Sequence, residues 1–322
     1  MKAIICSKYG SPDVLQLKEV EKPTPKEKEA LVKIHAASLN AADFEYLRGI
    51  LPIRLQSPFK PKYKILGSDI AGRVEDVGKN VNQFQLGDEV FADLYNFGFG
   101  AFAEYVCVPE SALRVKPINM TFEQAATLPQ AAVIALQGLR DKRMIQPGQK
   151  VLINGASGGV GTFAVQIAKS FGAEVTGVAS TKKLELVRSI GADHVIDYTQ
   201  EDFTKNGHHY DLILDVAAHH SILDYKRALS PNGIYSVVGG STSAFLQVIL
   251  LGPLISLFGS KKLGLMIWKP NKREDMVCLV DFFEDGKFVP VIDRVYPLSE
   301  VADGLKYLEE GNVQGKVVIT MV

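Results

Sequence analysis

QKVLINGASGGVGTFAVQIAKSFGAEVTGVAST, residues 149–181, is the stretch that decides the fold of this chain. It opens with the apolar run Lys150–Asn154, which is typical of a strand buried on both faces. Four glycines follow within seven residues, and a helical apolar period then runs to Gly172, a residue that suits a helix end. Glu174–Ala179 has the composition of a second strand. The stretch therefore predicts a β-α-β unit with its glycines at the turn from strand to helix.

The glycine-rich turn has the properties of a phosphate-binding site. Glycine adopts positive φ and lets other atoms approach the backbone closely. The first turn of a helix has unpaired N–H groups and a partial positive charge, which suit a pyrophosphate. The pattern AxGGVG, from Ala156 to Gly161, departs from strict GxGxxG, but the strand, helix and strand around it supply the required context. A tight turn without a ligand is the alternative.

Composition limits the remaining classes of function. A chain of 322 residues is long enough for two domains, and its 36 basic and 36 acidic residues give no net charge that would favour nucleic acid or an anionic membrane. Three separated cysteines without a CxxC favour reduced thiols over a disulfide framework. The N-terminal MKAIICSKYG lacks the apolar core of a signal peptide. We therefore expect a cytoplasmic protein that binds no nucleic acid.

The most apolar stretch, Phe245–Phe258, is interrupted by Gly252 and Pro253. At about 14 residues it is too short to span a bilayer, so no transmembrane segment is expected. We interpret it as a buried or subunit-interface segment, and weak contact with a membrane surface is the alternative.

The pattern of strands and helices changes twice along the chain. Residues 1–125 are mostly strand-like, with a short helix expected at Ala41–Arg48 and a loop over Arg54–Lys64. Strands and helices alternate from 126 to 267, which predicts a doubly wound parallel sheet. Residues 268–322 return to the first domain. The predicted fold is α/β, with a parallel-sheet domain inserted into a mostly-β domain.

Motifs along almost the whole chain resemble the medium-chain dehydrogenase/reductase superfamily, in its zinc-independent quinone oxidoreductase branch. The motifs are SLNAADFEYLRG (38–49), GSDIAGRVEDVG (67–78), FQLGDEVFA (84–92), AFAEYVCVP (101–109), AATLPQAAVIALQGL (125–139), NGASGGVGTFAVQIAK (154–169), GADHVIDY (191–198) and GKVVI (315–319). The resemblance implies a GroES-like catalytic domain at 1–125 and 268–322, a Rossmann domain at 126–267, and a cleft between them.

The resemblance also shows which metal ligands are missing. Zinc alcohol dehydrogenases of this superfamily bind a catalytic zinc through a Cys, a His-Glu pair and a further Cys or acid. Here Asn40 stands near the first ligand position, and Ser68 with Asp69 replaces the His-Glu pair. The four-cysteine lobe of a structural zinc is absent, and the His-His pairs at 208–209 and 219–220 have no further ligand at metal-binding spacing. We therefore predict no metal.

The residues after the second strand of the β-α-β unit indicate the cofactor. In NAD-preferring Rossmann domains an acidic residue ends this strand and binds the ribose 2′-OH. Here Ala179 is followed by Ser180, Thr181, Lys182 and Lys183, whose hydroxyl and ammonium groups suit a 2′-phosphate. A helix cap with solvated lysines is the alternative. We expect NADPH.

The resemblance supplies the other cofactor contacts. They are Ala156, Gly158, Gly159 and Val160 at the pyrophosphate, Tyr198 near the 2′-phosphate, Val216 and Ala217 after the fourth strand, Val238, Gly239 and Gly240 near the nicotinamide, and Lys316 at the cleft. Ile134 stands where relatives often carry Thr near the nicotinamide amide, so one expected hydrogen bond is missing.

Asn40, Asp43 and Tyr46 are the substrate-side candidates, because a spacing of three along a short helix places them on one face. Capping and packing is the alternative for them, since Asn and Asp are common helix caps. No catalytic residue is assigned, because hydride transfer is the chemistry of the cofactor. The apolar segments at 94–102 and 244–258 offer walls for a flat hydrophobic ring.

These observations predict an NADPH-dependent oxidoreductase that transfers a hydride to a quinone or a similar activated conjugated carbonyl without zinc. An enone or enal double-bond reductase is the alternative among enzymes, and an NADPH-binding protein with little turnover is the alternative from another class. We also expect a homodimer through the strand near Leu263–Lys269, with Phe245–Phe258 at or beside the interface, because an open sheet edge favours a partner strand.

Overall fold

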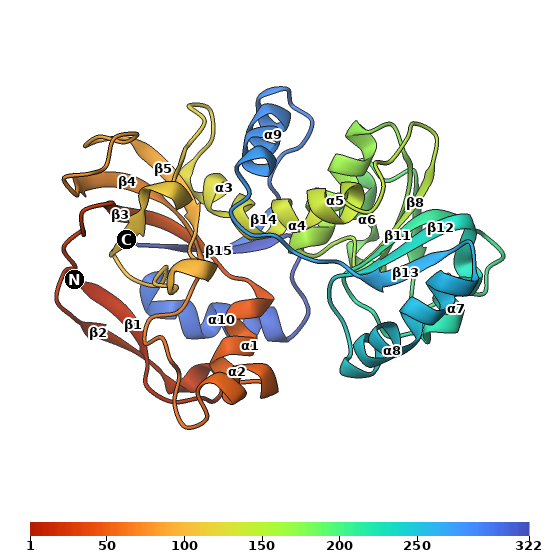
Figure 1. Ribbon diagram of the computed structural model, residues 1–322, viewed down its shortest axis with the longest axis horizontal. Helices are drawn as coiled ribbons and strands as arrows, with labels where there is room; N and C mark the ends of the chain where they lie inside the picture. Colours follow the sequence, from red (N-terminus) through yellow and green to blue (C-terminus); the bar gives the residue numbers. More distant parts are fainter. Residues whose placement is uncertain (322) are drawn as a thin grey trace. The chain divides into compact units, whose positions relative to one another are not determined.

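The structure is a computed structural model that describes residues 1–321 (Figure 1). The chain divides into two compact units. Unit 1 comprises Met1–Ala131, Pro270–Val280 and Ile292–Val322, and unit 2 comprises Ala132–Lys269 and Asp281–Val291. One unit is rich in strands and the other contains a parallel sheet, so the predicted α/β fold is confirmed.

Unit 1 is built around a seven-stranded sheet with the order β14-β15-β3-β4-β5-β7, in which β6 also pairs with β3. A separate antiparallel ribbon joins β1 and β2. The strands are β1 (Lys2–Cys6), β2 (Leu15–Glu19), β3 (Glu29–Ser38), β4 (Asp69–Val77), β5 (Glu89–Asp93), β6 (Tyr105–Pro109), β7 (Arg114–Val115), β14 (Ile292–Pro297) and β15 (Lys316–Thr320). Its helices are α1 (Ala41–Arg48), α2 (Leu51–Gln56), α3 (Phe122–Ala126) and α10 (Val301–Glu309).

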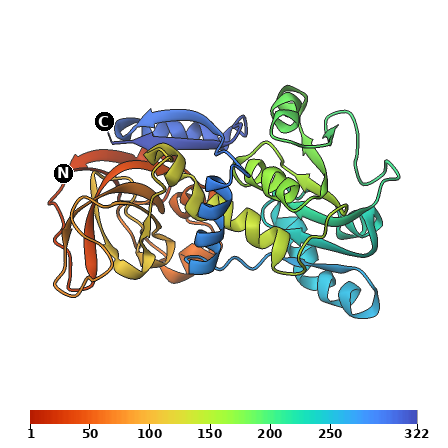
Figure 2. The same ribbon diagram turned by 90° about the horizontal axis from the view of Figure 1, so that it is seen from above.

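Two parts of unit 1 position its polar and aromatic side chains. The segments β14, α10 and β15, blue in Figure 2, lie side by side and bring Lys316 to the end of β3. A loop was expected at Arg54–Lys64. This expectation is wrong for residues 54–56, which belong to helix α2. Pro52 in the first turn favours helix initiation, but no residue of this six-residue helix is buried, so it has no apolar period to reveal it.

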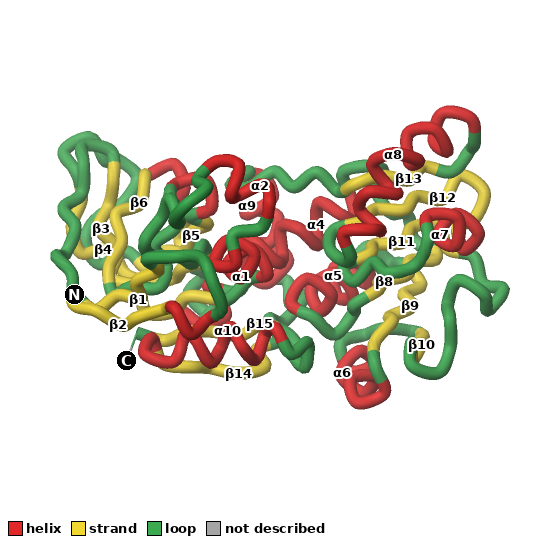
Figure 3. The backbone as a smooth tube through the Cα atoms, turned by 90° about the horizontal axis from the view of Figure 1, so that it is seen from below, coloured by secondary structure: helices red, strands yellow, loops and turns green. Residues whose placement is uncertain are grey.

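Unit 2 contains a parallel sheet with the order β10-β9-β8-β11-β12-β13 (Figure 3). This order reverses at β8, as expected for a doubly wound fold, and all five strand pairs are parallel. The strands are β8 (Lys150–Asn154), β9 (Glu174–Ala179), β10 (His194–Asp197), β11 (Tyr210–Asp215), β12 (Leu229–Val237) and β13 (Lys262–Leu265). The helices are α4 (Val133–Arg140), α5 (Gly159–Ser170), α6 (Leu184–Ser189), α7 (Ile222–Ala228) and α8 (Thr242–Phe258), and α9 (Arg273–Glu284) crosses from one unit to the other.

The apolar segment Phe245–Phe258 lies within α8, a continuous helix of 17 residues that contains Pro253. Only Ala244, Val248 and Gly252 of this helix are buried, so of the two expected roles the buried segment is wrong and the subunit interface stays a prediction. Gly252 allows α8 to lie close over β13, because a Cβ at this position would be 2.7 Å from the carbonyl oxygen of Leu263. Across residues 1–321, we find no helix with both the length and the apolar character needed to cross a membrane.

Candidate active site

The turn between β8 and α5 leaves the first turn of the helix open. Gly158 is the N-cap of α5, and no side chain caps the helix. Gly155 has φ of 81°, and a Cβ on Gly161 would lie 2.1 Å from the carbonyl oxygen of Gly155. Glycine is therefore required at both positions, one for its backbone conformation and one for close packing of helix and turn. The open N–H groups suit a pyrophosphate, so this turn fits a dinucleotide.

The four residues predicted at the pyrophosphate lie in this turn. Ala156 is buried, and its N–H donates to the carbonyl oxygen of Val178 at 3.0 Å. Gly158, Gly159 and Val160 are half-buried and form the start of α5. Ala156 therefore holds the turn against β9, while the other three residues keep an accessible surface.

The loops after β8, β11 and β12 meet beside this turn. The N–H of Val216 donates to the carbonyl oxygen of Asn154 at 3.0 Å. The N–H of Ala218 donates to the carbonyl oxygen of Gly239 at 2.9 Å. A Cβ added to Gly155 would lie 3.3 Å from the Cβ of Ala217. A Cβ added to Gly240 would lie 2.4 Å from the backbone nitrogen and oxygen of Ala218. The structure thus brings the predicted residues Val216, Ala217, Val238, Gly239 and Gly240 together with the glycine-rich turn.

Buried side chains that sequence reasoning missed connect these loops. The side-chain amide of Asn154 donates to Asp215 at 2.8 Å and to the carbonyl oxygen of Ala217 at 3.2 Å. Asp215 also accepts from the hydroxyl of Tyr235 at 3.0 Å, and burial raises the pKa of its carboxyl. One signal was available in the sequence, since Asn154 and Asp215 each end an apolar strand. These two strands are neighbours in the sheet, and Asn154 lies opposite Asp215 in their register.

The residues predicted at the 2′-phosphate lie at the ends of β9 and β10. Ser180 is the N-cap of a short 3₁₀ turn formed by Thr181, Lys182 and Lys183. Lys182 is exposed and Lys183 is half-buried. Tyr198 is 54% exposed, and its N–H donates to the carbonyl oxygen of Ala179 at 3.2 Å. The structure therefore groups these predicted residues at one edge of the sheet.

An unpredicted carboxylate lies in the same group. Asp197 ends β10 and is in register with Ala179 of β9. Its carboxylate accepts from the hydroxyl of Thr181 at 2.5 Å, and from the N–H and hydroxyl of Thr199 at 3.0 and 2.7 Å. These hydrogen bonds lower the pKa of Asp197. Sequence reasoning searched for an acid only at the end of β9 and missed the one on the neighbouring strand.

In unit 1, Lys316, Asn40 and Asp69 form a buried polar cluster. The ammonium of Lys316 donates to the side-chain oxygen of Asn40 at 2.5 Å and to the carbonyl oxygen of Leu39 at 2.9 Å, and lies 3.9 Å from Asp69. The side-chain amide of Asn40 donates to Asp69 at 2.9 Å. The ammonium therefore makes two hydrogen bonds and one longer ion pair with Asp69. Lys316 therefore orients Asn40, and its predicted contact with the cofactor stays a prediction.

Two more buried carboxyls lie close to this cluster. Asp43 is fully buried and accepts from the backbone N–H of Asn40 at 2.8 Å, and burial raises its pKa to about 7. Burial and the charge of Asp69 raise the pKa of Asp93, which accepts from the N–H of Tyr95 at 2.8 Å. Asn40 and Asp43 thus form a capping box at the start of α1, and the substrate-side role stays a prediction for Asn40, Asp43 and Tyr46.

Hydrogen-bonded side chains also occupy the positions that the family resemblance relates to zinc ligands. Ser68 accepts from the side-chain amide of Gln130 at 2.9 Å, and Asn40 and Asp69 bond to each other. Among residues 1–321, no group of three or more His, Cys, Asp or Glu side chains has a geometry that could hold a metal ion. The positive charge in this cluster is the ammonium of Lys316.

Tyr46 lies in an aromatic pocket of about 270 Å³ in unit 1, formed with Tyr63, Tyr95 and Phe99 beside α2. The centroid of the Phe99 ring lies 5.0, 5.4 and 5.6 Å from the ring centroids of Tyr46, Tyr63 and Tyr95, respectively. Phe99 has φ of 62°, an uncommon conformation for a residue other than glycine. Its ring lines the pocket. Strained backbone conformations of this kind often occur at functional sites.

The aromatic pocket also carries polar groups. Burial raises the pKa of the Tyr46 hydroxyl to about 12, so it stays protonated at neutral pH and can donate a hydrogen bond. Burial also raises the pKa of Glu45, which lines the same pocket. A flat apolar ring with a polar substituent is the ligand class that suits such a lining.

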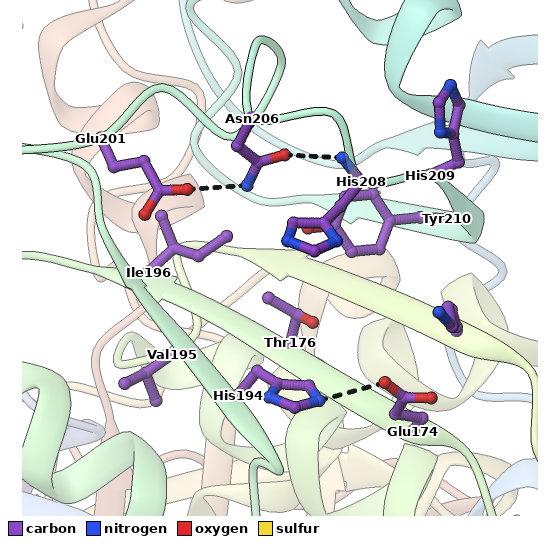
Figure 4. Close-up of a pocket in the computed structure, with 11 residues that line it drawn as sticks. Glu174, Thr176, His194, Val195, Ile196, Glu201, Asn206, His208, His209 and Tyr210 are labelled. Atoms are coloured by element: carbon purple, nitrogen blue, oxygen red, sulfur yellow. Dashed lines mark hydrogen bonds and ion pairs between the residues drawn. The ribbon is translucent and has the colours of Figure 1, made fainter.

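A second cavity of about 270 Å³ lies at the opposite ends of the unit 2 strands, where β8, β9, β10 and β11 begin (Figure 4). His194 lies 3.0 Å from Glu174 there, and Asn206 donates to Glu201 at 2.8 Å. His208 also lines this cavity, in agreement with its exposed position near the start of β11. Because the glycine-rich turn follows the other end of β8, this cavity takes no part in the dinucleotide site.

Comparison with known proteins adds the family. Residues 26–118 match a family model described as alcohol dehydrogenase GroES-like domain, and residues 190–319 match one described as zinc-binding dehydrogenase. The chain is 36% identical to a 2-methylene-furan-3-one reductase of Solanum lycopersicum, covering 99% of this chain and 79% of that protein. It is 34% identical to an NADPH-dependent alkenal/one oxidoreductase of Arabidopsis thaliana, with the same coverage, and 31% identical to a chloroplast envelope quinone oxidoreductase homolog of that plant, covering 99% and 98%.

Solved structures agree in fold over the whole chain. The quinone oxidoreductase of Coxiella burnetii has a TM-score of 0.88 and 29% identity, covering 100% of this chain and 99% of that one. The Escherichia coli quinone oxidoreductase complexed with NADPH has a TM-score of 0.87 and 25% identity, covering 99% and 100%.

Proposed function

The chain belongs to the medium-chain dehydrogenase/reductase superfamily, in its zinc-independent quinone oxidoreductase branch, and we propose that it uses NADPH to reduce a quinone or an enone. The aromatic pocket carries this proposal. Its four rings, Tyr46, Tyr63, Tyr95 and Phe99, suit a flat conjugated acceptor and not a small aliphatic alcohol. When bound, NADPH supplies the hydride chemistry.

We assign residues 126–267 to the NADP(H)-binding domain, and 1–125 with 268–322 to the catalytic domain. The open N–H groups of Gly159 and Val160 would hold the pyrophosphate. The group at Ser180–Lys183 with Tyr198 would hold the 2′-phosphate, and the loops that contain Val216, Ala217 and Val238–Gly240 would hold the nicotinamide end.

On the substrate side, the protein orients the acceptor and stabilises charge on its oxygen. The Asn40 amide has two N–H groups, and Asp69 accepts from one of them. The second N–H of Asn40 and the protonated hydroxyl of Tyr46 are the donors that we assign to the acceptor oxygen. Lys316 keeps Asn40 in place by holding its side-chain oxygen.

The decisive experiment compares kcat/KM with NADPH for panels of quinones and enones, and with NADP⁺ for primary alcohols. We expect turnover of a quinone or an enone and none of alcohols. Enones that greatly exceed quinones would favour the double-bond reductase; two relatives are named as a 2-methylene-furan-3-one reductase and an NADPH-dependent alkenal/one oxidoreductase. Efficient alcohol oxidation, or tight NADPH binding without turnover of either panel, would contradict the proposal.

The pocket itself is tested by Phe99→Ala. We expect kcat/KM for the preferred acceptor to fall at least about tenfold, or 1.4 kcal/mol, because a ring of the pocket is lost. NADPH affinity should stay within about twofold. Phe97→Ala is the matched control, since this ring is 40% exposed in the same segment and does not line the pocket. Equal losses in both variants would contradict the assignment.

We also propose a homodimer in a reducing compartment such as the cytoplasm. Strand β13 ends the six-stranded sheet, and within residues 1–321 it pairs only with β12, so its other edge is open to a partner strand. Cys6 is buried, and Cys107 and Cys278 are half-buried. Light scattering tests the dimer, and cell fractionation tests the compartment, because some relatives are named as chloroplastic or mitochondrial proteins.

A further inference from the structure

The segment that runs from Tyr46 through α2 to Ser68 is strongly basic. It contains five basic residues and no Asp or Glu, although the whole chain has equal numbers of acids and bases. Arg48 pairs with Glu309. Among the residues that the structure describes, no acid forms an ion pair with the other four, which are Arg54, Lys60, Lys62 and Lys64. The protein therefore leaves these four charges without a counter-charge.

Lys62 is the basic residue of this segment that lines the aromatic pocket. Its side chain is exposed, and its ammonium lies 5.1 Å from the centroid of the Tyr63 ring. The Tyr46 hydroxyl lies beside the backbone of both Tyr63 and Lys62. Lys62 therefore borders the part of the pocket that contains the hydroxyl assigned to the acceptor oxygen.

The turn before Lys62 is held in place by hydrogen bonds. The hydroxyl of Tyr9 donates to the carbonyl oxygen of Ser57 at 2.8 Å. The hydroxyl of Ser57 donates to the carbonyl oxygen of Lys60 at 2.7 Å, and Pro61, the next residue, is buried. These contacts fix the backbone of Lys62 at the edge of the pocket, while its flexible four-carbon side chain remains free to meet a ligand.

The carboxyl of Glu45 also lines the pocket, so the pocket contains charges of both signs. Burial and, after it, the charge of Glu45 raise the pKa of the Tyr95 hydroxyl, which places Glu45 close to Tyr95. Lys62 lies against Tyr63 instead. Burial also raises the pKa of Glu45, so the pocket disfavours its charged form. The two groups therefore lie against different rings, and the positive charge is the one beside Tyr63.

We propose that the acceptor carries an anionic group, such as a carboxylate, which binds the ammonium of Lys62. This inference rests on the proposed function, because it names the class of quinone or enone that the aromatic pocket takes. The rings of the pocket would hold the flat conjugated part, and Lys62 would form a charge-assisted hydrogen bond with the anionic group. Arg54, Lys60 and Lys64 on the same segment add a positive potential that favours the approach of an anion.

The test compares kcat/KM with NADPH for matched pairs of acceptors. Each pair consists of a quinone or an enone with a short side chain that ends in a carboxylate, and the methyl ester of the same compound. The two members have nearly the same intrinsic reactivity, so the acid-to-ester ratio measures recognition of the charge. We expect this ratio to be about five at low ionic strength and to approach one in about 0.5 M NaCl, because salt screens exposed charges.

Three variants and one control test the role of Lys62. Lys62→Gln should lower the acid-to-ester ratio to about one, whereas Lys62→Arg should retain most of it, because arginine keeps the charge. Glu45→Gln should raise the ratio about twofold, since it removes an opposing charge. Lys60→Gln is the matched control, because this exposed lysine belongs to the same segment and does not line the pocket. It should leave the ratio nearly unchanged.

Binding of analogues that cannot be reduced separates this inference from the proposed function. By calorimetry, the saturated counterpart of the enone acid should bind the full-length protein at least about threefold more tightly than its methyl ester, and Lys62→Gln should remove this difference. Tighter binding of the acid without turnover of any acceptor would contradict the reductase and support the anion site.

Turnover or binding that shows no preference for the acid overturns the anion site, and so does an unchanged preference in Lys62→Gln. An equal loss of preference in Lys60→Gln overturns it as well, because the charge of the whole segment would then be the cause. If Lys62→Gln lowers kcat/KM equally for acid and ester, the ammonium acts on charge that develops at the acceptor oxygen, which also overturns the proposal.

Discussion

The glycine-rich turn of unit 2 and the polar cluster of unit 1 are built in different ways. The turn, which we assign to the dinucleotide, is formed by the backbone, through the open N–H groups at the start of α5 and glycines that allow close approach. The cluster, which we assign to the substrate side, is formed by the side chains of Lys316, Asn40 and Asp69. A backbone site is limited by space, whereas a cluster of buried charges is limited by electrostatics and responds to pH.

This difference decides how each part fails. A Cβ in the glycine-rich turn creates a steric clash, which salt and pH do not relieve. A neutral residue in the polar cluster leaves a buried charge without its partner, and the cost depends on whether the other group can be neutralised by a proton. The following variants separate the two behaviours.

Lys316→Met has the largest expected effect. Loss of the ammonium leaves Asp69 buried beside Asn40, which should lower the free energy of unfolding by about 3–5 kcal/mol. Removal of this charge raises the pKa of Asp69 further, so its ionisation opposes folding more strongly, and the loss should be larger at pH 8 than at pH 5. Denaturant unfolding at the two pH values measures both effects.

The double variant Lys316→Met, Asp69→Asn is the control for this interpretation. It removes both charges, so it should recover most of the lost stability. NADPH affinity of the folded double variant should stay within about threefold of that of the unmodified protein, because in this interpretation Lys316 orients Asn40 and does not bind the cofactor. A tenfold change in affinity would correspond to about 1.4 kcal/mol. A much larger loss of NADPH affinity would instead favour the direct cofactor contact predicted for Lys316.

Gly161→Ala tests the backbone site. The new Cβ would lie 2.1 Å from the carbonyl oxygen of Gly155, so helix and turn must separate, which should lower stability by about 2–3 kcal/mol. NADPH affinity should fall at least about a hundredfold, or 2.7 kcal/mol, because the N–H groups of the turn move apart. The loss of stability should be the same at pH 5 and pH 8.

Gly158→Ala is the matched control for this clash. A Cβ at Gly158 meets only the carbonyl oxygen of Gly155, at 3.5 Å, and the φ of this residue is −82°. Its stability without cofactor should change by less than about 1 kcal/mol. Equal destabilisation by Gly158→Ala and Gly161→Ala would show that the tight packing at Gly161 is not the cause.

The same difference explains what the sequence could predict. The glycine-rich turn is contiguous, and its spacing within a strand-helix-strand pattern indicates the chemistry directly. The polar cluster joins residues from the end of β3, the start of β4 and the start of β15, and no local pattern indicates that they meet. Asp197 was missed for a related reason, because strand order places β10 beside β9 only in the folded sheet. The exposure of α8 was missed because a continuous apolar run does not show which side of a helix is covered.

Asp93→Asn sharpens the electrostatic side of the comparison. Burial and the charge of Asp69 raise the pKa of Asp93 in the folded protein, so its ionisation opposes folding and stability falls as pH rises above its unfolded value. The variant removes this effect, and its stability relative to the unmodified protein should increase by about 1–3 kcal/mol between pH 5 and pH 8. Asp285→Asn, at an exposed position after α9, is the control for the loss of a carboxylate. A flat difference for Asp93→Asn would contradict the raised pKa.

Asp197→Asn has the smallest expected effect, and it tests whether a side chain modulates the backbone site. The carboxylate binds Thr181, within the group that we assign to the 2′-phosphate, so its negative charge opposes the phosphate. Its removal should raise NADPH affinity about two- to fivefold, leave NADH affinity unchanged, and have less effect at high salt, as expected for exposed charges.

Lys182→Ala with Lys183→Ala should act in the opposite direction and lower NADPH affinity about tenfold. Glu201→Gln, which removes an exposed charge near the cavity at the other ends of the strands, is the control. Fluorescence titration of both cofactors measures these changes. If Asp197→Asn instead weakens NADPH binding, the carboxylate acts by orienting Thr181, and the hydroxyl of Thr181 is then the essential contact.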